Sequence, residues 1–164
     1  MDVKRSQPIG IELVRRGIVT EADIDKALDY QKRHPKKKIG DILDILKLCD
    51  PHILIDAIGE ILEERAIYLQ ENDIKINVLD YVSLDIIKEN KAIPFDIVSG
   101  RVKVCFADTS NRKSTDVIRL LLLNKGLVMD RYITFESNID NIVNSLEGVV
   151  SDDINTNTDV SGMV

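Results

Sequence analysis

The chain carries one short pattern twice, at an offset of 30 residues: Ile9-Gly10-Ile11-Glu12-Leu13-Val14, and then Ile39-Gly40-Asp41-Ile42-Leu43-Asp44. Each copy is followed by a good helix-capping residue, Thr20 in the first and Asp50 in the second, where Pro51 also suits the first helical position. Apolar residues then recur at helical spacing after both caps. The repeat therefore predicts, in each copy, a short apolar turn after Ile-Gly and then an amphipathic helix.

A different pattern begins near residue 82. Ile93–Val98 and Val102–Phe106 are typical of two strands, and Ser99-Gly100-Arg101 between them is typical of a hairpin turn with Gly available for positive φ. The other elements expected in this part are helices at 84–90, 115–124 and 138–146 and a third strand at 132–135.

Together the two patterns predict an α+β fold with three parts. A helical tandem-motif subdomain is expected over residues 1–75, and a small α/β subdomain over 76–148. The remaining segment, 149–164, is rich in Asp, Asn, Thr, Ser and Gly and has little apolar surface to bury, so we expect a disordered tail or linker there.

Composition and charge exclude several classes of protein. The 164 residues are 44% hydrophobic, which is enough for a core, and the net charge of −6 argues against binding DNA, RNA or anionic membranes. No apolar run approaches the ~20 residues of a membrane-spanning helix, and the N-terminus does not resemble a secretory signal. Cys49 and Cys105 do not form a CxxC metal pair, and we expect both to be buried in a cytoplasmic protein.

The residues of the repeat follow the spacing of a known family motif. The first copy fits at Ile9, Gly10, Leu13, Val14, Gly17, Ile18, Val19, Ile24, Leu28 and Gln31, and the second at Lys38, Ile39, Gly40, Leu43, Leu48, Cys49, Leu54 and Ile58. In this pattern the chain resembles the MshEN domain, which lies at the N-terminus of bacterial type IV pilus assembly and type II secretion ATPases and binds cyclic di-GMP. Pro8 stands where the motif has its leading Arg, and Asp44, Lys47 and Ile61 replace its aliphatic residue, Gly and Gln.

The second half of the chain adds to this resemblance. Residues 92–108, from Ala-Ile-Pro-Phe through the hairpin to Ala-Asp, look like the α/β domain of the same ATPases, with Thr109 in place of a Pro. The likeness covers roughly residues 5–147. No GxxxxGK[ST] phosphate loop occurs, so we expect the ATPase domain to be absent from this chain and to follow the linker, with a free-standing small protein as the alternative.

The resemblance implies a site for cyclic di-GMP, which presents two guanines and two phosphates. Gly10 and Gly40 lack a Cβ and let the backbone approach a ligand, while Gln31 and Asp108 can bond guanine edges and Lys38 can neutralise a phosphate. The ligand-binding candidates are Arg5, Ile9, Gly10, Leu13, Val14, Gln31, Lys38, Ile39, Gly40, Leu43 and Asp108. No catalytic constellation or metal-ligand spacing occurs, so we expect no enzyme activity, metal or cofactor.

Each candidate also has a structural interpretation. Arg5 is assigned only as a nearby substitute for the Arg that Pro8 replaces, the two glycines also suit tight turns, and Lys36–Lys38 also suits a solvated charge run. The same holds for function. The expected role is to couple cyclic di-GMP to a pilus or secretion ATPase. The alternative is a docking module that anchors the ATPase to its inner-membrane platform proteins without nucleotide.

Overall fold

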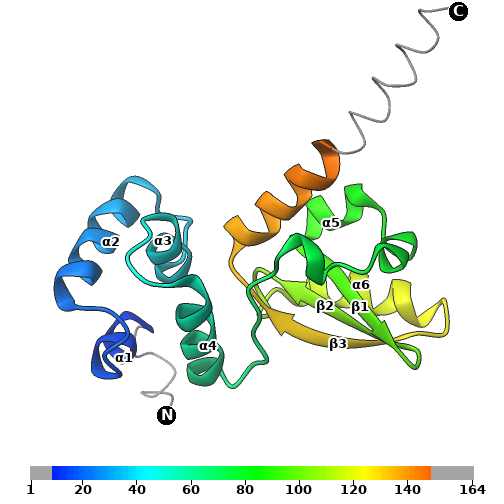
Figure 1. The fold of residues 1–164 in the computed structure, drawn as a ribbon, viewed down its shortest axis with the longest axis horizontal. Helices are drawn as coiled ribbons and strands as arrows, with labels where there is room; N and C mark the ends of the chain where they lie inside the picture. The colour runs from blue at the N-terminus through cyan, green and yellow to red at the C-terminus, as the bar shows by residue number, and fades with distance from the viewer. Residues whose placement is uncertain (1–8, 149–164) are drawn as a thin grey trace, which may run out of the picture.

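The computed structural model describes residues 9–148. These residues fold into two halves (Figure 1). A helical half is built from the repeat, and an α/β half follows it, so the expected α+β fold is confirmed. The predictions for Arg5 and for the segment 149–164 lie outside the described residues.

Each copy of the repeat forms a short helix and then a longer one. The helices are α1 (Ile9–Arg15), α2 (Glu21–Arg33), α3 (Ile39–Ile45) and α4 (Pro51–Leu62). The expected apolar turn after Ile-Gly is wrong, because α1 and α3 begin at these pairs and have seven residues each. Helices of this length are marginal alone, and burial stabilises them here: Leu13 in α1 and Leu43 in α3 are both 0% exposed.

The two longer helices begin at the predicted caps. Thr20 Oγ1 accepts a hydrogen bond from Asp23 N (3.1 Å) and Asp23 Oδ2 accepts one from Thr20 N (3.0 Å), which completes a capping box at the start of α2. The Asp50 carboxylate accepts from two backbone N–H groups in the first turn of α4, where Pro51 is the first residue. A cap of this kind contributes about 1 kcal/mol to helix stability.

The α/β half is a small mixed sheet with helices around it. Its elements are η1 (Glu71–Asp73), η2 (Ile76–Asp80), α5 (Leu84–Asn90), β1 (Ala92–Val98), β2 (Arg101–Phe106), α6 (Arg112–Leu123), β3 (Val128–Ile133) and a final helix over residues 136–148. β1 and β2 are antiparallel, and their hairpin has left-handed backbone at Ser99 (φ 51°) and Gly100 (φ 77°). β3 lies parallel to β2 after the crossover through α6, so the strand order is β1-β2-β3.

The third strand is longer on its N-terminal side than expected and ends earlier. It begins at Val128 and stops at Ile133, whereas the apolar pattern predicted 132–135. The first four residues of β3 read Val-Met-Asp-Arg, without the alternation of apolar and polar residues by which a strand is recognised, and in the structure they are exposed or half-buried. Pairing with β2 along its whole length, from Arg101 to Phe106, makes them a strand.

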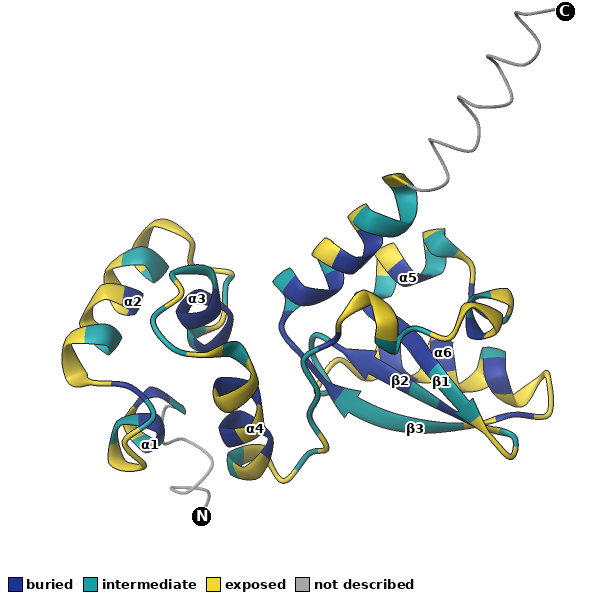
Figure 2. Ribbon diagram, in the orientation of Figure 1, coloured by how far each residue is buried: buried dark blue, intermediate teal, exposed yellow. Residues whose placement is uncertain are grey.

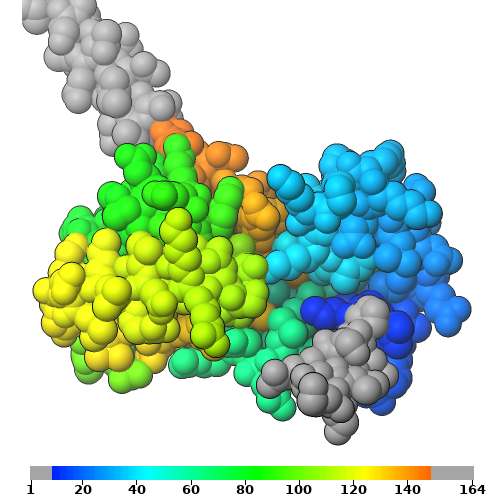
Figure 3. All heavy atoms as spheres, turned by 180° about the vertical axis from the view of Figure 1, so that it is seen from behind, coloured from blue at the N-terminus to red at the C-terminus, as the bar shows by residue number. Residues whose placement is uncertain are grey.

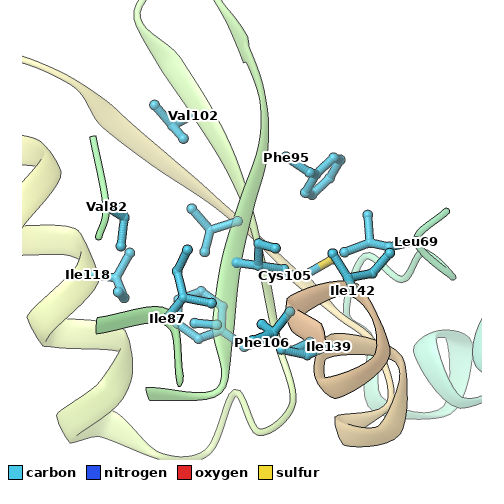
Figure 4. Close-up of a cluster of buried hydrophobic side chains, with 14 of the residues drawn as sticks. Leu69, Val82, Ile87, Phe95, Val102, Cys105, Phe106, Ile118, Ile139 and Ile142 are labelled. Carbon is cyan, nitrogen blue, oxygen red and sulfur yellow. The ribbon is translucent and has the colours of Figure 1, made fainter. Parts of the chain in front are cut away.

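Each half has its own hydrophobic cluster, and one segment belongs to both. Phe106, Ile118 and Ile139 belong to the cluster of the α/β half, in which Ile118 lies near Val82 and Ile139 lies near Phe106 (Figure 4). Ile133 and Phe135, at the end of β3, are instead buried in the cluster of the helical half. Figure 2 shows the buried residues gathered inside each half. The halves are therefore joined by apolar packing as well as by the chain.

The connection between the halves runs beside β3. Ile67 N donates to Ile133 O (3.1 Å) and Ile133 N donates to Arg65 O (2.8 Å). Leu69 is already buried in the α/β cluster, whereas the division expected from the sequence falls after residue 75. Within residues 9–148 the structure contains no helix with both the length and the apolar character to span a bilayer.

Candidate functional site

A cavity of about 1050 Å³ lies between the helical half and the α/β half. Figure 3 shows the face on which the blue and cyan helical half meets the yellow-green segment that follows β2. The helical half contributes Ile9, Lys38, Gly40, Asp41, Ile55, Ile58 and Leu62 to the cavity wall. The α/β half and the connection contribute Glu64, Ala107, Asp108, Thr109, Ser110, Arg112, Thr115, Asp116, Arg119, Arg131, Ile133, Thr134 and Phe135.

Two of the predicted site residues, one from each half, meet at this cavity. Lys38 Nζ donates to Ala107 O (2.9 Å) and lies 3.6 Å from Asp108 Oδ1. The loop that carries Lys38 is held by Gln31, whose Nε2 donates to Lys37 O (2.9 Å). Both partners of the Lys38–Asp108 pair are about half exposed, at 53% and 43%, so the pair contributes little stability. A ligand can therefore separate the two side chains at little cost in free energy.

Asp108 is held in its charged form. Partial burial raises its pKa, but hydrogen bonds from Ser110 and the nearby Lys38 ammonium outweigh that effect, and the pKa of Asp108 lies below its ordinary value. The Asp108 carboxylate accepts from both the N–H and the hydroxyl of Ser110. At neutral pH it therefore presents an anionic acceptor to the cavity, on the opposite wall from the apolar residues of α4.

The glycines at positions 10 and 40 let α1 pack closely on α2 and α3 pack closely on α4. A Cβ on Gly40 would lie 2.7 Å from Ile58 Cδ1, and one on Gly10 would lie 3.2 Å from Ile24 Cδ1. Both glycines are buried within helices, so neither is the tight-turn residue that the alternative interpretation required. Gly40 also borders the cavity, whereas Gly10 does not.

Several predicted site residues lie away from the cavity. Leu13 and Leu43 are 0% exposed in the helical cluster and do not line the cavity. Val14 and Ile39 are half-buried against that cluster. Gln31 borders a separate, shallower depression beside α2. The cavity thus brings together Ile9, Lys38, Gly40 and Asp108 from the predicted set.

Three arginines on the α/β wall were missed by the sequence reasoning. Arg131 is paired with Glu64 (2.8 Å) and Arg119 with Asp116 (2.7 Å). The side chain of Arg112, by contrast, makes no ion pair or hydrogen bond to the described residues. No signal in the sequence pointed to Arg112, because the helix expected there begins at residue 115. In the structure α6 begins at Arg112, so Arg112 and Arg119, seven residues apart, share a face of it.

Asp41, which also borders the cavity, is the most buried charged side chain in its wall. It is 7% exposed, and this burial raises its pKa to about 6, against the opposing effects of a hydrogen bond from Glu136 N and the charge of Lys38. The acidic and basic residues of the lining balance, with Asp41, Glu64, Asp108 and Asp116 against Lys38, Arg112, Arg119 and Arg131. No group of three His, Cys, Asp or Glu side chains within residues 9–148 is placed to hold a metal ion.

This fold and cavity can be compared with known proteins. Residues 63–151 match the family model of the MshEN domain. The chain therefore belongs to the MshEN domain family, as its sequence predicted. The matched segment is the α/β half with the connection that leads into it, so this match rests on the second half of the chain and not on the repeat.

Two solved structures share the fold. The chain is similar to a structure of MshE with cdg (cyclic di-GMP), with a TM-score of 0.58 and 18% identity over 85% of this chain and 98% of that one. It is also similar to the N-terminal domain of XpsE, with a TM-score of 0.52 and 19% identity over 83% of this chain and 91% of that one. No curated protein matches the sequence.

Proposed function

We propose that this domain binds cyclic di-GMP in the cavity between its two halves and regulates a type IV pilus assembly or type II secretion ATPase. The observation that carries the proposal is the meeting of Lys38 and Asp108, from opposite halves, at one cavity. Membership of the MshEN family and the fold shared with MshE, solved with cyclic di-GMP, support the choice of ligand. In this proposal the domain acts in the cytoplasm by binding, without catalysis or a cofactor of its own.

The size and apolar surface of the cavity suit a dinucleotide. Small-molecule sites usually have volumes of about 300–1,000 Å³, and this cavity, at about 1050 Å³, lies just above that range. Ile9, Ile55, Ile58 and Leu62 form an apolar surface on one wall. In a chain that is only 4% aromatic, aliphatic side chains of this kind supply the surface on which guanine faces pack.

The polar groups suit the remainder of the ligand. Asp108 accepts hydrogen bonds from the N1–H and exocyclic N–H₂ of a guanine, as an ionised carboxylate can. Lys38 and Arg112 neutralise the phosphates, Lys38 after it separates from Asp108 and Arg112 with no competing carboxylate among the described residues. A balanced lining therefore serves a ligand that offers both N–H donors and anionic oxygens.

Isothermal titration with cyclic di-GMP tests the proposal. Asp108→Asn keeps the shape of the side chain but turns an NH₂ toward the guanine edge, so we expect affinity to fall by about tenfold to a hundredfold. Lys38→Ala is expected to lower the affinity for cyclic di-GMP by about tenfold. The matched controls are Asp29→Asn and Lys36→Ala, which change the same residue types outside the cavity.

A second ligand sharpens the same experiment. Adenine lacks the N1–H and the exocyclic 2-amino group that Asp108 accepts from, so cyclic di-AMP should bind the parent protein weakly and should lose little more in Asp108→Asn. Equal binding of the two dinucleotides, or no binding of either by the parent protein, contradicts the proposal.

An exposed apolar stripe favours a second candidate function, docking to an inner-membrane platform protein. Val117, Leu120 and Leu123 on α6 are 38%, 59% and 49% exposed, whereas Ile118 and Leu122 on the same helix are buried. Scattered exposed leucines are ordinary, but three at one helical spacing form a patch. Leu120→Asp with Leu123→Asp should abolish co-purification with the cognate platform protein and leave dinucleotide affinity unchanged. Leu62→Asp in the cavity should lower dinucleotide affinity and leave co-purification unchanged.

A further inference from the structure

One short helix contacts both the cavity and the start of the final helix. Gly40 of α3 borders the cavity, and the next residue, Asp41, points across to the α/β half. Asp41 Oδ1 accepts a hydrogen bond from Glu136 N (3.1 Å). One helical turn further along α3, Asp44 Oδ2 accepts from Ser137 Oγ (2.8 Å). The two carboxylates of α3 therefore hold the first two residues of the final helix.

Both carboxylates are buried at the contact between the two halves. Asp41 is 7% exposed and Asp44 is 9% exposed. Burying an ionised carboxylate is unfavourable unless hydrogen bonds replace its water, and each of these accepts one such bond from the other half. The two acids bring little stability, and what they contribute is a defined separation between α3 and the final helix.

The segment that they hold is itself part of the cavity wall. Thr134 and Phe135 border the cavity directly before Glu136. Phe135 is also buried in the helical cluster beside Gly40, so the wall cannot move without moving the start of the final helix. A ligand that contacts both halves therefore acts on the same junction that Asp41 and Asp44 hold.

We propose that Asp41 and Asp44 are positioning residues that set the separation of the two cavity walls and couple ligand binding to the order of the final helix over residues 136–148. The inference rests on the proposed function, because the ligand is the one proposed above. Coupling of this kind is reciprocal. If the ligand stabilises the junction by some factor, loss of the junction lowers the affinity for the ligand by the same factor, which is about 5–150-fold in typical cases.

Hydrogen–deuterium exchange and titration calorimetry on the same proteins test the inference. In the parent protein, cyclic di-GMP is expected to slow amide exchange at residues 136–143 by about tenfold or more. Asp41→Ala with Asp44→Ala should raise exchange at these amides without ligand, leave exchange in α2 unchanged, and lower affinity by about tenfold. In Asp41→Asn with Asp44→Asn, each side chain keeps one acceptor oxygen, so both hydrogen bonds to the final helix can still form. This variant should have an affinity within about threefold of the parent.

The controls separate this inference from the proposed function. Asp56→Ala changes an exposed acid on α4 that lies outside the cavity and the junction, and it should alter neither readout. If the parent binds the dinucleotide and the double alanine variant binds equally well, or if the ligand protects other amides but not 136–143, the inference is overturned and the proposed function stands. If the parent protein does not bind, both are overturned.

Discussion

The two copies of the repeat have the same backbone in different surroundings. Gly17 has φ 73° after α1, and Lys47, its counterpart after α3, has φ 54°. The hydrogen bonds that end the two short helices also correspond: Ile18 N donates to Leu13 O (2.9 Å), and Leu48 N donates to Leu43 O (3.2 Å). The second copy thus adopts the left-handed conformation of the family's Gly although a Lys occupies the position.

The copies differ where the second one faces the α/β half. Ile11 in the first copy is 57% exposed, whereas its counterpart Asp41 is 7% exposed. Asp29 on α2 is exposed to solvent, whereas its counterpart Gly59 is buried against the chain that leaves α4. The repeat therefore determines the course of the backbone, and the surface that each copy meets determines which side chains it can carry.

The largest expected effect comes from giving the second copy a residue of the first. A Cβ on Gly59 would lie 2.7 Å from Ala66 Cβ and 2.9 Å from Glu64 O. Backbone cannot move aside as a flexible side chain can, so Gly59→Asp should lower the free energy of unfolding by more than about 3 kcal/mol, from overpacking and a buried charge together. Gly59→Ala should lower it by about 2 kcal/mol, and Asp29→Ala should change it by less than about 0.5 kcal/mol. Urea denaturation measures all three, and an equal loss at positions 29 and 59 would break the comparison.

The next effect is a pH dependence of opposite sign in the two copies. Burial raises the pKa of Asp41 to about 6 from an ordinary value near 3.8, so the folded protein binds more protons than the unfolded chain between these values. Stability from this group is therefore present below about pH 4 and lost as pH rises through 6, by up to about 3 kcal/mol. Glu12 in the first copy behaves oppositely, because hydrogen bonds from Arg15 and Arg16 lower its pKa to about 2.

Thermal unfolding between pH 4 and 7 checks this difference. Asp41→Asn removes the titrating group and should be more stable than the parent at pH 7, with a smaller loss of stability between pH 4 and 6. Glu12→Gln should leave that window unchanged, since Glu12 titrates below it. A parent protein and an Asp41→Asn variant with parallel pH profiles would contradict the assignment.

A smaller effect is expected on ligand affinity at the α/β wall. Arg112→Ala removes a cation without a carboxylate partner among the described residues, and it should weaken cyclic di-GMP binding by about tenfold, or about 1.4 kcal/mol. Arg119→Ala removes a cation already paired with Asp116 and should weaken binding by less than about threefold. Calorimetry at one fixed salt concentration compares them. A larger loss of affinity in Arg119→Ala than in Arg112→Ala would contradict the assignment of Arg112 and would place the phosphate contact at Arg119.

The smallest effect tests the left-handed residue itself. A non-glycine residue with left-handed backbone is destabilised by about 1–2 kcal/mol, which the greater chain entropy of unfolded Gly partly offsets. Lys47→Gly should therefore raise the free energy of unfolding by about 0.5–1 kcal/mol, and Gly17→Lys should lower it by a similar amount. Equal stability of the parent and both variants in urea would contradict the predicted cost of placing Lys in left-handed backbone at these two turns.

Much of the local structure follows from short stretches of sequence. The capping residues Thr20 and Asp50 predicted the starts of α2 and α4, and Ser99-Gly100 predicted the hairpin. These signals act between residues close together in the chain, where a few hydrogen bonds or one backbone angle decide the conformation. The family assignment rested on the spacing of the repeat motif and on residues 92–108, and the family model confirms it over residues 63–151.

The site could be predicted only in part. Lys38 and Asp108 were assigned from two separate motifs, and they meet across the cavity. Leu13 and Leu43 were assigned to the same site, but they face the core of the helical half. An aliphatic residue at a given spacing has the same signature whether it contacts a ligand or a neighbouring helix, because apolar burial has no preferred direction.

The patterns along the chain determined a helical repeat, an α/β half and a set of candidate contacts, because each depends on residues near one another in sequence. The tertiary structure alone decided that Asp41 and Asp44 hold the final helix, that Arg112 lies on a cavity wall, and that Val128–Arg131 belongs to a strand. Each of these depends on a partner brought close by folding, such as Glu136 for Asp41 or β2 for the first residues of β3. The type of a residue and its neighbours in the sequence do not determine which distant part of the chain will pack against it.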